Sequence, residues 1–175
     1  MINSPKAWRA GATLYFLKKG KPHFLLFERD KKCENWPGAL MFGWGGQVRE
    51  SEKRLVENKD PGVIALMREK REEIGKLLPK KDLIGAPWPI VSILHGDEPT
   101  KRSVGTGYLV RISEEAANRI VKNSGLLREL VNPKIVTLGY LEKIHSSKPE
   151  KFQPHYLQLF SIIRDYFASR RASRT

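Results

Sequence analysis

Four charged side chains stand close together in one short stretch of the sequence: Arg68, Glu69, Glu72 and Glu73. On a helix, residues three and four apart are neighbours, so the three carboxylates would share one side. Like charges at this spacing destabilise a helix by roughly a few tenths of a kcal/mol per pair. A hard divalent cation would neutralise them, and Mg²⁺ prefers oxygen ligands. The alternative is a solvated acidic face in which Arg68 pairs with Glu72.

The flanking residues predict the helix that would carry these side chains. Asp60 can cap the free backbone N–H groups of a first turn, and Pro61 suits the first helical position because its missing N–H is not needed there. Gly75 stands where a left-handed residue would end the helix. Apolar residues at helical spacing predict one buried stripe, formed by Val63, Met67 and Ile74.

The rest of the sequence predicts strands mixed with further helices. Apolar runs bounded by Gly, Pro and polar residues predict strands over 11–16, 23–28, 40–44, 87–95, 103–112 and 134–138. The turn 18–22 would make the first two strands antiparallel neighbours. Ser113 can cap a helix, and a C-terminal helix over 153–170 would bury Leu157, Phe160, Ile163 and Phe167 before a basic tail over 171–175. We therefore predict one domain over 1–175 with an α+β fold, in which helices cover a mixed sheet.

Composition narrows the function classes. A formal net charge of +13 attracts anions such as phosphates, nucleotides and RNA. No apolar run approaches the roughly 20 residues of a membrane span. Cys33 is the only cysteine, which excludes a disulfide within the chain. The four histidines show no metal-ligand spacing, so zinc is not expected. We expect a cytoplasmic protein that does not bind membranes.

The segment from Gly46 to Gly75 resembles the Nudix box. That pattern is Gly, five residues, Glu, seven residues, Arg-Glu, an apolar residue, any residue, Glu-Glu, any residue, Gly and then an apolar residue. Every charged and glycine position is present in order, and a second glycine precedes the first: Gly45, Gly46, Glu52, Arg68, Glu69, Glu72, Glu73 and Gly75.

The sequence departs from this pattern in three places. Fifteen residues rather than seven separate Glu52 from Arg68, an insertion from Lys53 to about Asp60 that costs little stability in a loop. The apolar positions that follow Arg-Glu and the last glycine hold Lys70 and Lys76. Lys70 can carry its amine to solvent along an apolar stem, and Leu77 can replace Lys76 in the core.

The resemblance implies an α/β/α sandwich and a hydrolase that uses Mg²⁺, with Mn²⁺ as the alternative ion. Its reaction would cleave the diphosphate bond of a nucleoside diphosphate linked to another group. The family's roles would make Glu69, Glu72 and Glu73 catalytic metal ligands, joined by a backbone carbonyl of Gly45 or Gly46. Glu52 would pair with Arg68 and orient the helix, or itself approach a metal.

The general base differs among members of the family. Apart from the box glutamates, we favour Glu98, in a turn, and Glu114, after the last long strand. Glu115 and Glu142 are further candidates. The alternative for each of them is a solvated acid at a turn or at the start of a helix.

Other residues can recognise a substrate. Aromatic side chains that can stack on a nucleobase, or instead fill the core, are Trp36, Trp44, Trp88 and Tyr108. Cations that can hold phosphates, or instead stand as plain surface charges, are Arg29, Arg49, Lys101 and Arg102. A nucleotide derivative is the expected partner, and the charge also suits an RNA 5′ end. A non-catalytic nucleotide- or RNA-binding module is the second hypothesis, and both are compatible with a homodimer.

Overall fold

A mixed β-sheet lies at the centre of the computed structural model, which describes residues 7–34, 36–54, 60–95, 103–152 and 154–172. Within these ranges seven strands form the sheet: β1 (Ala7–Lys18), β2 (Lys21–Arg29), β3 (Leu40–Met41), β4 (Gly45–Gln47), β5 (Trp88–His95), β6 (Ser103–Arg111) and β7 (Leu130–Thr137). The α-helices are α1 (Glu50–Arg54), α2 (Pro61–Glu73), α3 (Glu114–Lys122), α4 (Leu138–Ser147) and α5 (Pro154–Ala172). Short 3₁₀ helices cover Gly75–Leu77, Lys80–Asp82, Ser124–Leu126 and Pro149–Lys151.

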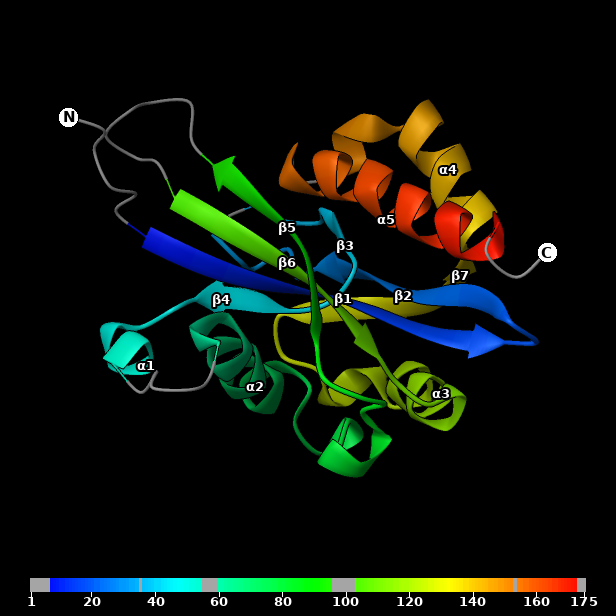
Figure 1. Cartoon of the computed structure of the whole chain (residues 1–175). Helices are drawn as coiled ribbons and strands as arrows, with labels where there is room; N and C mark the ends of the chain where they lie inside the picture. Colours follow the sequence, from blue (N-terminus) through cyan, green and yellow to red (C-terminus); the bar gives the residue numbers. More distant parts are fainter. Residues whose placement is uncertain (1–6, 35, 55–59, 96–102, 153, 173–175) are drawn as a thin grey trace.

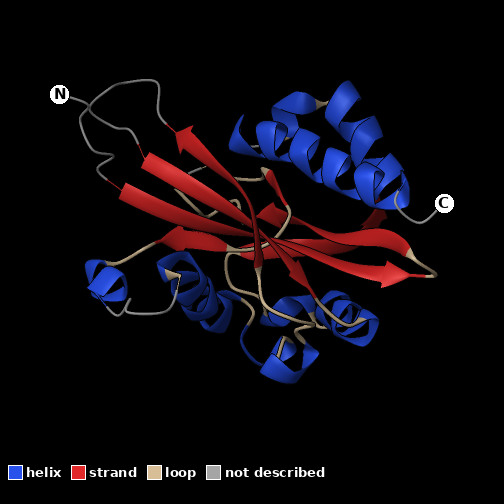
Figure 2. Cartoon of the chain, in the orientation of Figure 1, coloured by secondary structure: helices blue, strands red, loops and turns tan. Residues whose placement is uncertain are grey.

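Helices cover both faces of the sheet, which makes three layers. In Figure 1, α1, α2 and α3 lie on one face, and α4 and α5 lie on the other. Figure 2 shows the strands as one layer between these two sets of helices. Aliphatic and aromatic side chains fill the space between the layers and form one buried core cluster. The predicted α+β sandwich with a mixed sheet is therefore confirmed.

β1 is the strand around which the sheet is built. The strand order of the sheet is β3-β2-β1-β6-β5, with β4 paired to β1 and β7 paired to β2. β6 runs parallel to β1 over the whole length of β6, from Ser103 opposite Ala7 to Arg111 opposite Tyr15. The opposite edge of β1 pairs first with β4, where Ala10 faces Gly46, and later with β2. β1 thus connects the segment before α2 to the rest of the sheet.

The turn between β1 and β2 follows from its residues. Lys19 and Gly20 both have positive φ, at 49° and 73°. A two-residue hairpin with positive φ at both positions matches the right-handed twist of the strands that it joins. The predicted antiparallel pairing of β1 and β2 is confirmed, with Tyr15 opposite Phe24.

Several predicted bounds were wrong. The single strand predicted over 40–44 is divided into β3 and β4. Between them, the carbonyls of Phe42 and Trp44 accept hydrogen bonds from the backbone N–H groups of Leu14 and Ala12 in β1. α1 and α4 were not predicted. The last strand was predicted to end at residue 138, but it ends at Thr137, because the Thr137 side chain caps α4. α5 continues to Ala172, so two residues assigned to the basic tail are helical. Its predicted stripe is buried at Phe160, Ile163 and Phe167. No described helix has the length and apolar character of a membrane span.

Candidate functional site

The N-terminus of α2 is fixed by a cap that also joins it to β6. Asp60 Oδ1 accepts a hydrogen bond from the backbone N–H of Gly62 at 2.8 Å. Asp60 Oδ2 accepts one from the Tyr108 hydroxyl at 2.7 Å. A Cβ on Gly62 would lie 2.1 Å from the Tyr108 hydroxyl oxygen, so the glycine permits this close approach. The cap places the start of the helix directly after the inserted segment, whose residues 55–59 lie outside the described ranges.

Tyr108→Phe is expected to lower the free energy of unfolding by about 1–3 kcal/mol, because it removes a hydrogen bond to a carboxylate at the helix cap. Urea unfolding of the pure protein measures the change. Tyr140→Phe, at an exposed tyrosine of α4, is the matched control and should have little effect. Equal unfolding midpoints for the two variants would show that the cap contributes nothing.

The buried side of α2 differs from the predicted stripe. Ile74 is buried, but Val63 and Met67 are only partly so. The residues of α2 that face the core are instead Gly62, Ala65, Leu66, Lys70 and Glu73. The small residues let the helix approach the sheet, where the Trp44 indole N–H donates to the Leu66 carbonyl at 2.8 Å. This side of α2 therefore includes two charged residues.

The prediction that Lys70 carries its amine to solvent is wrong. The side chain is buried, and Nζ donates to the carbonyl oxygen of Leu78 at 2.6 Å. Burial lowers the pKa of Lys70, with a smaller contribution from Arg71. The amine thus satisfies a carbonyl beyond the end of α2. Leu77 is buried while Lys76 is exposed, as predicted.

Arg68 connects α2 to the segment before it. Its Nε donates to Glu52 Oε1 at 2.8 Å, and Nη2 donates to the backbone carbonyl of Gln47 at 2.8 Å. Glu52 also accepts from the backbone N–H of Arg49 at 2.7 Å, and these hydrogen bonds hold the pKa of its carboxyl low against the opposing effect of burial. The predicted Glu52–Arg68 pair is therefore present. It fixes the orientation of α2 relative to α1 and β4.

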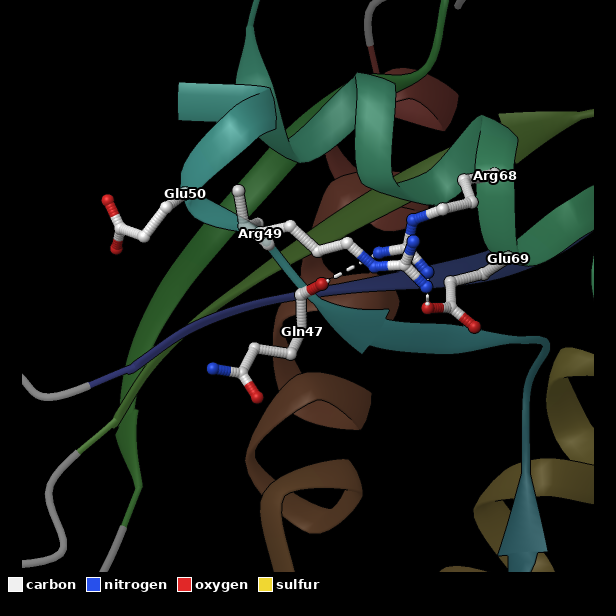
Figure 3. A pocket seen from close by; sticks show the side chains of 6 residues that line it. Gln47, Arg49, Glu50, Arg68 and Glu69 are labelled. Carbon is white, nitrogen blue, oxygen red and sulfur yellow. Dashed lines mark hydrogen bonds and ion pairs between the residues drawn. The ribbon is translucent and has the colours of Figure 1, made fainter. Parts of the chain in front are cut away.

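Glu69 lies directly over Gly46. A Cβ on Gly46 would lie 2.1 Å from Glu69 Oε1, so a larger residue would displace this carboxylate. Glu69 also accepts a hydrogen bond from Arg68 Nη1 (Figure 3). Beside the two side chains is an open pocket of about 430 Å³, lined by Gln47, Val48, Arg49, Glu50, Arg68 and Glu69. The pocket thus places two carboxylates and two guanidinium groups beside the glycine strand β4.

Glu72 and Glu73 have different surroundings. Glu72 is exposed and lies 3.9 Å from both Arg49 and Arg68. Glu73 is buried, and its pKa is raised to about 8, first by burial and then by Glu129, Glu69 and Glu72, while Arg29 opposes the shift. Three carboxylates therefore act on Glu73, at the C-terminal end of α2.

These carboxylates are not gathered into a coordination shell. Within the described ranges no three Asp, Glu, His or Cys side chains stand as metal ligands, because Glu69 turns to Arg68 and Glu72 lies between two arginines. The donor set nevertheless suits a hard cation: oxygen ligands, mutual repulsion at Glu73, and a glycine that admits Glu69 beside the carbonyls of β4.

The raised pKa of Glu73 predicts how stability depends on pH. Because the folded pKa of about 8 lies above the ordinary 4.5, the folded chain binds more protons in this interval. Its stabilising effect is complete below pH 4.5 and is lost as the pH rises through about 8. The change is on the order of 4 kcal/mol. In EDTA we expect the free energy of unfolding to fall between pH 5 and 8.

Glu73→Gln should flatten this dependence, since the amide carries no charge at any pH. Glu50→Gln, at an exposed residue of α1, is the control and should keep the slope of the original chain. Urea unfolding at four pH values within this interval measures both. Parallel profiles for Glu73→Gln and Glu50→Gln would contradict the assignment of the effect to Glu73.

Other predicted site residues lie elsewhere. Glu114 pairs with Lys18 at 2.5 Å, at the far end of β1, about 26 Å along the strand from the residue that faces Gly46. Glu115 is beside it on α3, and Glu142 is exposed on α4, on the opposite face of the sheet (Figure 1). None of these three can serve as a base at the pocket. Glu98, Lys101 and Arg102 lie outside the described residues.

For two of the four aromatic candidates, the core alternative is the one that holds. Trp44 and Tyr108 are fully buried and hydrogen-bonded to α2 or its cap, so neither can stack on a base. Trp36 and Trp88 are exposed. Of the phosphate-binding candidates, Arg49 lines the pocket and Arg29 lies near Glu73.

Glu129 acts on Glu73, and the sequence analysis did not single it out. Its carboxylate raises the pKa of Glu73 more than Glu69 or Glu72 does. Arg29 Nη2 lies 3.4 Å from Glu129 Oε2, and the backbone N–H of Asp30 donates to the Glu129 carbonyl at 2.8 Å. In the sequence, the position of Glu129 just before a strand is the only feature that could have indicated it. The last strand was predicted to begin later, at residue 134. β7 in fact begins directly after Glu129, at Leu130.

Comparisons with known proteins agree with this architecture. No family model matches the sequence, and no curated protein matches it. Among solved structures, a mutT/nudix family protein from Listeria innocua matches with a TM-score of 0.65 and 14% identity, over 97% of this chain and 99% of that one. An Ap4A hydrolase from C. elegans matches with a TM-score of 0.55 and 18% identity, over 93% and 96%.

A third solved structure is the NUDIX domain of Shewanella oneidensis NrtR complexed with ADP ribose. It matches with a TM-score of 0.57 and 13% identity, over 93% of this chain and 89% of that one. At these identities the likeness establishes the fold. The chain has the fold of Nudix proteins.

Proposed function

We propose that this chain is a Mg²⁺-dependent hydrolase of the Nudix type, which cleaves the diphosphate bond of a nucleoside diphosphate linked to another group. The observation that carries the proposal is the position of Glu69 over Gly46, at the edge of a pocket that also presents Arg49 and Arg68. The segment that bears the ordered Nudix-box residues is thereby the segment that forms the pocket.

The proposed metal ligands are Glu69, Glu72 and Glu73, with a backbone carbonyl of Gly45 or Gly46. A bound Mg²⁺ would neutralise phosphate charge and supply an activated water. Glu52 and Arg68 hold α2 in place, as their hydrogen bonds indicate. Arg49, whose side chain is exposed at the pocket, is placed to contact a phosphate oxygen. Catalysis would come from positioning and electrostatics.

The proposed general base is Glu73 or Glu129. Glu73 is buried beside Glu129, Glu69 and Glu72, and burial and these carboxylates raise the pKa of the metal-free side chain. A cation beside it would lower that pKa and leave the carboxylate ionised. Glu129 lies near enough to Glu73 to raise its pKa, and it is not one of the Nudix-box residues. A Glu129→Gln variant that loses kcat while it retains metal affinity would assign the base to Glu129.

A substrate screen tests the proposal. The full chain is incubated with Mg²⁺ or Mn²⁺ and with Ap4A, ADP-ribose, nucleoside triphosphates, and capped or triphosphorylated RNA; two of these compounds are chosen because they occur in the names of similar structures. Products are identified by mass spectrometry in ¹⁸O-labelled water, where label in a phosphate product locates the bond that breaks. We expect turnover of at least one compound that EDTA abolishes.

A non-catalytic nucleotide- or RNA-binding module is the second candidate. Its support is the +13 net charge and the fact that Glu69 and Glu72 face arginines as placed. Steeply salt-dependent RNA binding with no Mg²⁺-dependent product from any compound would favour this candidate and contradict the hydrolase.

A further inference from the structure

A second group of cations and aromatic rings lies where β1, β6 and α5 meet, far from the pocket. Tyr15 and Arg111 are in-register partners on the parallel strands β1 and β6. In-register residues on neighbouring strands point to the same face of the sheet. For Tyr15 that face is the one covered by α5, because its ring packs edge-on against Phe167, with 5.2 Å between centroids.

The last turns of α5 bring a second arginine to this place. Tyr166 packs edge-on against Phe167 at 5.1 Å, and the Arg170 guanidinium lies 4.6 Å from the centre of the Tyr166 ring. Burial and Tyr166 raise the pKa of the Tyr15 hydroxyl, while Arg111 and Arg170 both oppose that rise. Both guanidinium groups are therefore close enough to act on one hydroxyl.

Neither of these two arginines pairs with an acid among the described residues. Within the described residues, Arg111 and Arg170 form no ion pair with a carboxylate, and Nε of Arg111 is buried without a hydrogen-bond acceptor. A buried donor of a charged group without a partner is costly, so an acceptor from outside the chain would be favoured there. Asp165, the nearest acid on the helix, is bonded to Arg164 at 3.0 Å. Asp165 is therefore not a hydrogen-bond acceptor for Arg111 or Arg170.

The basic character continues along the β1–β2 hairpin. Its exposed lysines, Lys19 and Lys21, lie roughly 10–15 Å beyond Tyr15 along the strand direction. Figure 1 shows the hairpin tip and the C-terminal end of α5 at the same end of the molecule, opposite α1 and β4. A helix C-terminus itself repels anions, so attraction here must come from the side chains.

We propose that Arg111 and Arg170, with the hydroxyl groups of Tyr15 and Tyr166, form a second phosphate-binding site, and that its ligand is a phosphate of a polynucleotide strand that continues over the hairpin lysines. Two guanidinium groups can each donate a fork of N–H bonds to phosphate oxygens. The hairpin gives a strand further charges to contact, which a free phosphate could not use. This inference does not rest on the proposed hydrolase activity.

Fluorescence anisotropy of a labelled 20-nucleotide RNA, in EDTA so that no hydrolysis intervenes, tests the site on the full chain. R111Q combined with R170Q should weaken binding about tenfold or more, and reduce the slope of log K against log salt by about 0.7 per lost phosphate contact. R164Q, on the same helix and paired with Asp165, is the matched control and should change affinity less than twofold. Equal losses in the double variant and in R164Q would overturn the proposal.

Two further measurements keep the test decisive. If R111Q does not fold by circular dichroism, the exposed R170Q alone should still weaken binding about threefold, and an unchanged affinity would refute the site. Calorimetric titration with inorganic phosphate distinguishes the source of the ligand. Phosphate that binds this site as tightly as the RNA does would overturn the polynucleotide assignment, whereas weak, millimolar binding would support it.

Discussion

Glu69→Gln and Glu73→Gln are each expected to lower kcat for the best substrate by about 10³-fold or more. Removal of one carboxylate from a Mg²⁺ site withdraws several kcal/mol of charge stabilisation in the transition state, and each ~1.4 kcal/mol is a tenfold change in rate. Glutamine keeps the size of the side chain, so the position of Glu69 over Gly46 is retained. Steady-state kinetics at saturating Mg²⁺ measure the loss.

Glu142→Gln is the control for this pair, since Glu142 is exposed on α4 across the sheet. Its kcat should remain within twofold of the original value. Glu73→Gln should also be the more stable protein in EDTA at pH 8, because a buried charge has been removed. A loss of activity together with a gain of stability separates a functional defect from misfolding. Full activity in both variants would remove Glu69 and Glu73 from the proposed site.

Arg68→Met is expected to destabilise the chain by about 3–5 kcal/mol, the largest effect on stability that we predict. The Arg68 and Glu52 side chains are 12% and 7% exposed, and loss of the guanidinium would leave Glu52 buried without its partner. The carbonyl of Gln47 would lose its donor as well. Urea unfolding at pH 7 measures the change.

Two further variants identify the cause. Arg71→Met, at an exposed position of the same helix, should cost less than about 0.5 kcal/mol. The double variant Glu52→Leu with Arg68→Met should recover most of the loss, because the buried Glu52 carboxylate is then removed together with its partner. A double variant as unstable as Arg68→Met alone would show that the arginine acts through packing instead.

Local patterns predicted the elements that surround the pocket. The cap at Asp60, the positive φ of Gly75 and the pairing of Glu52 with Arg68 depend on residues close in sequence or on one ordered motif. The buried side of α2 could not be predicted in this way. Periodicity assigns apolar side chains to the core, but here a lysine and a glutamate are buried, since one meets a carbonyl beyond the helix and the other meets distant carboxylates.

The other errors have a common physical origin. Whether Glu114 or Glu129 lies near Glu73 depends on which end of a strand faces α2, and this is set by pairings between residues about 100 positions apart. Trp44 and Tyr108 carry the same chemistry whether they stack on a ligand or hold a helix. Only their burial and their hydrogen bonds to α2 and Asp60 separate the two roles.

The position of β1 also constrains the order in which the chain can fold. Its parallel partner, β6, follows it by some 95 residues, whereas β2 and β4 are near neighbours in sequence. Closing so long a loop before its contacts form slows folding. During synthesis the hairpin and the Gly45–Gly46 strand can therefore form early, but β1 keeps one edge open until β6 has left the ribosome. Such an unpaired edge is where nascent chains aggregate.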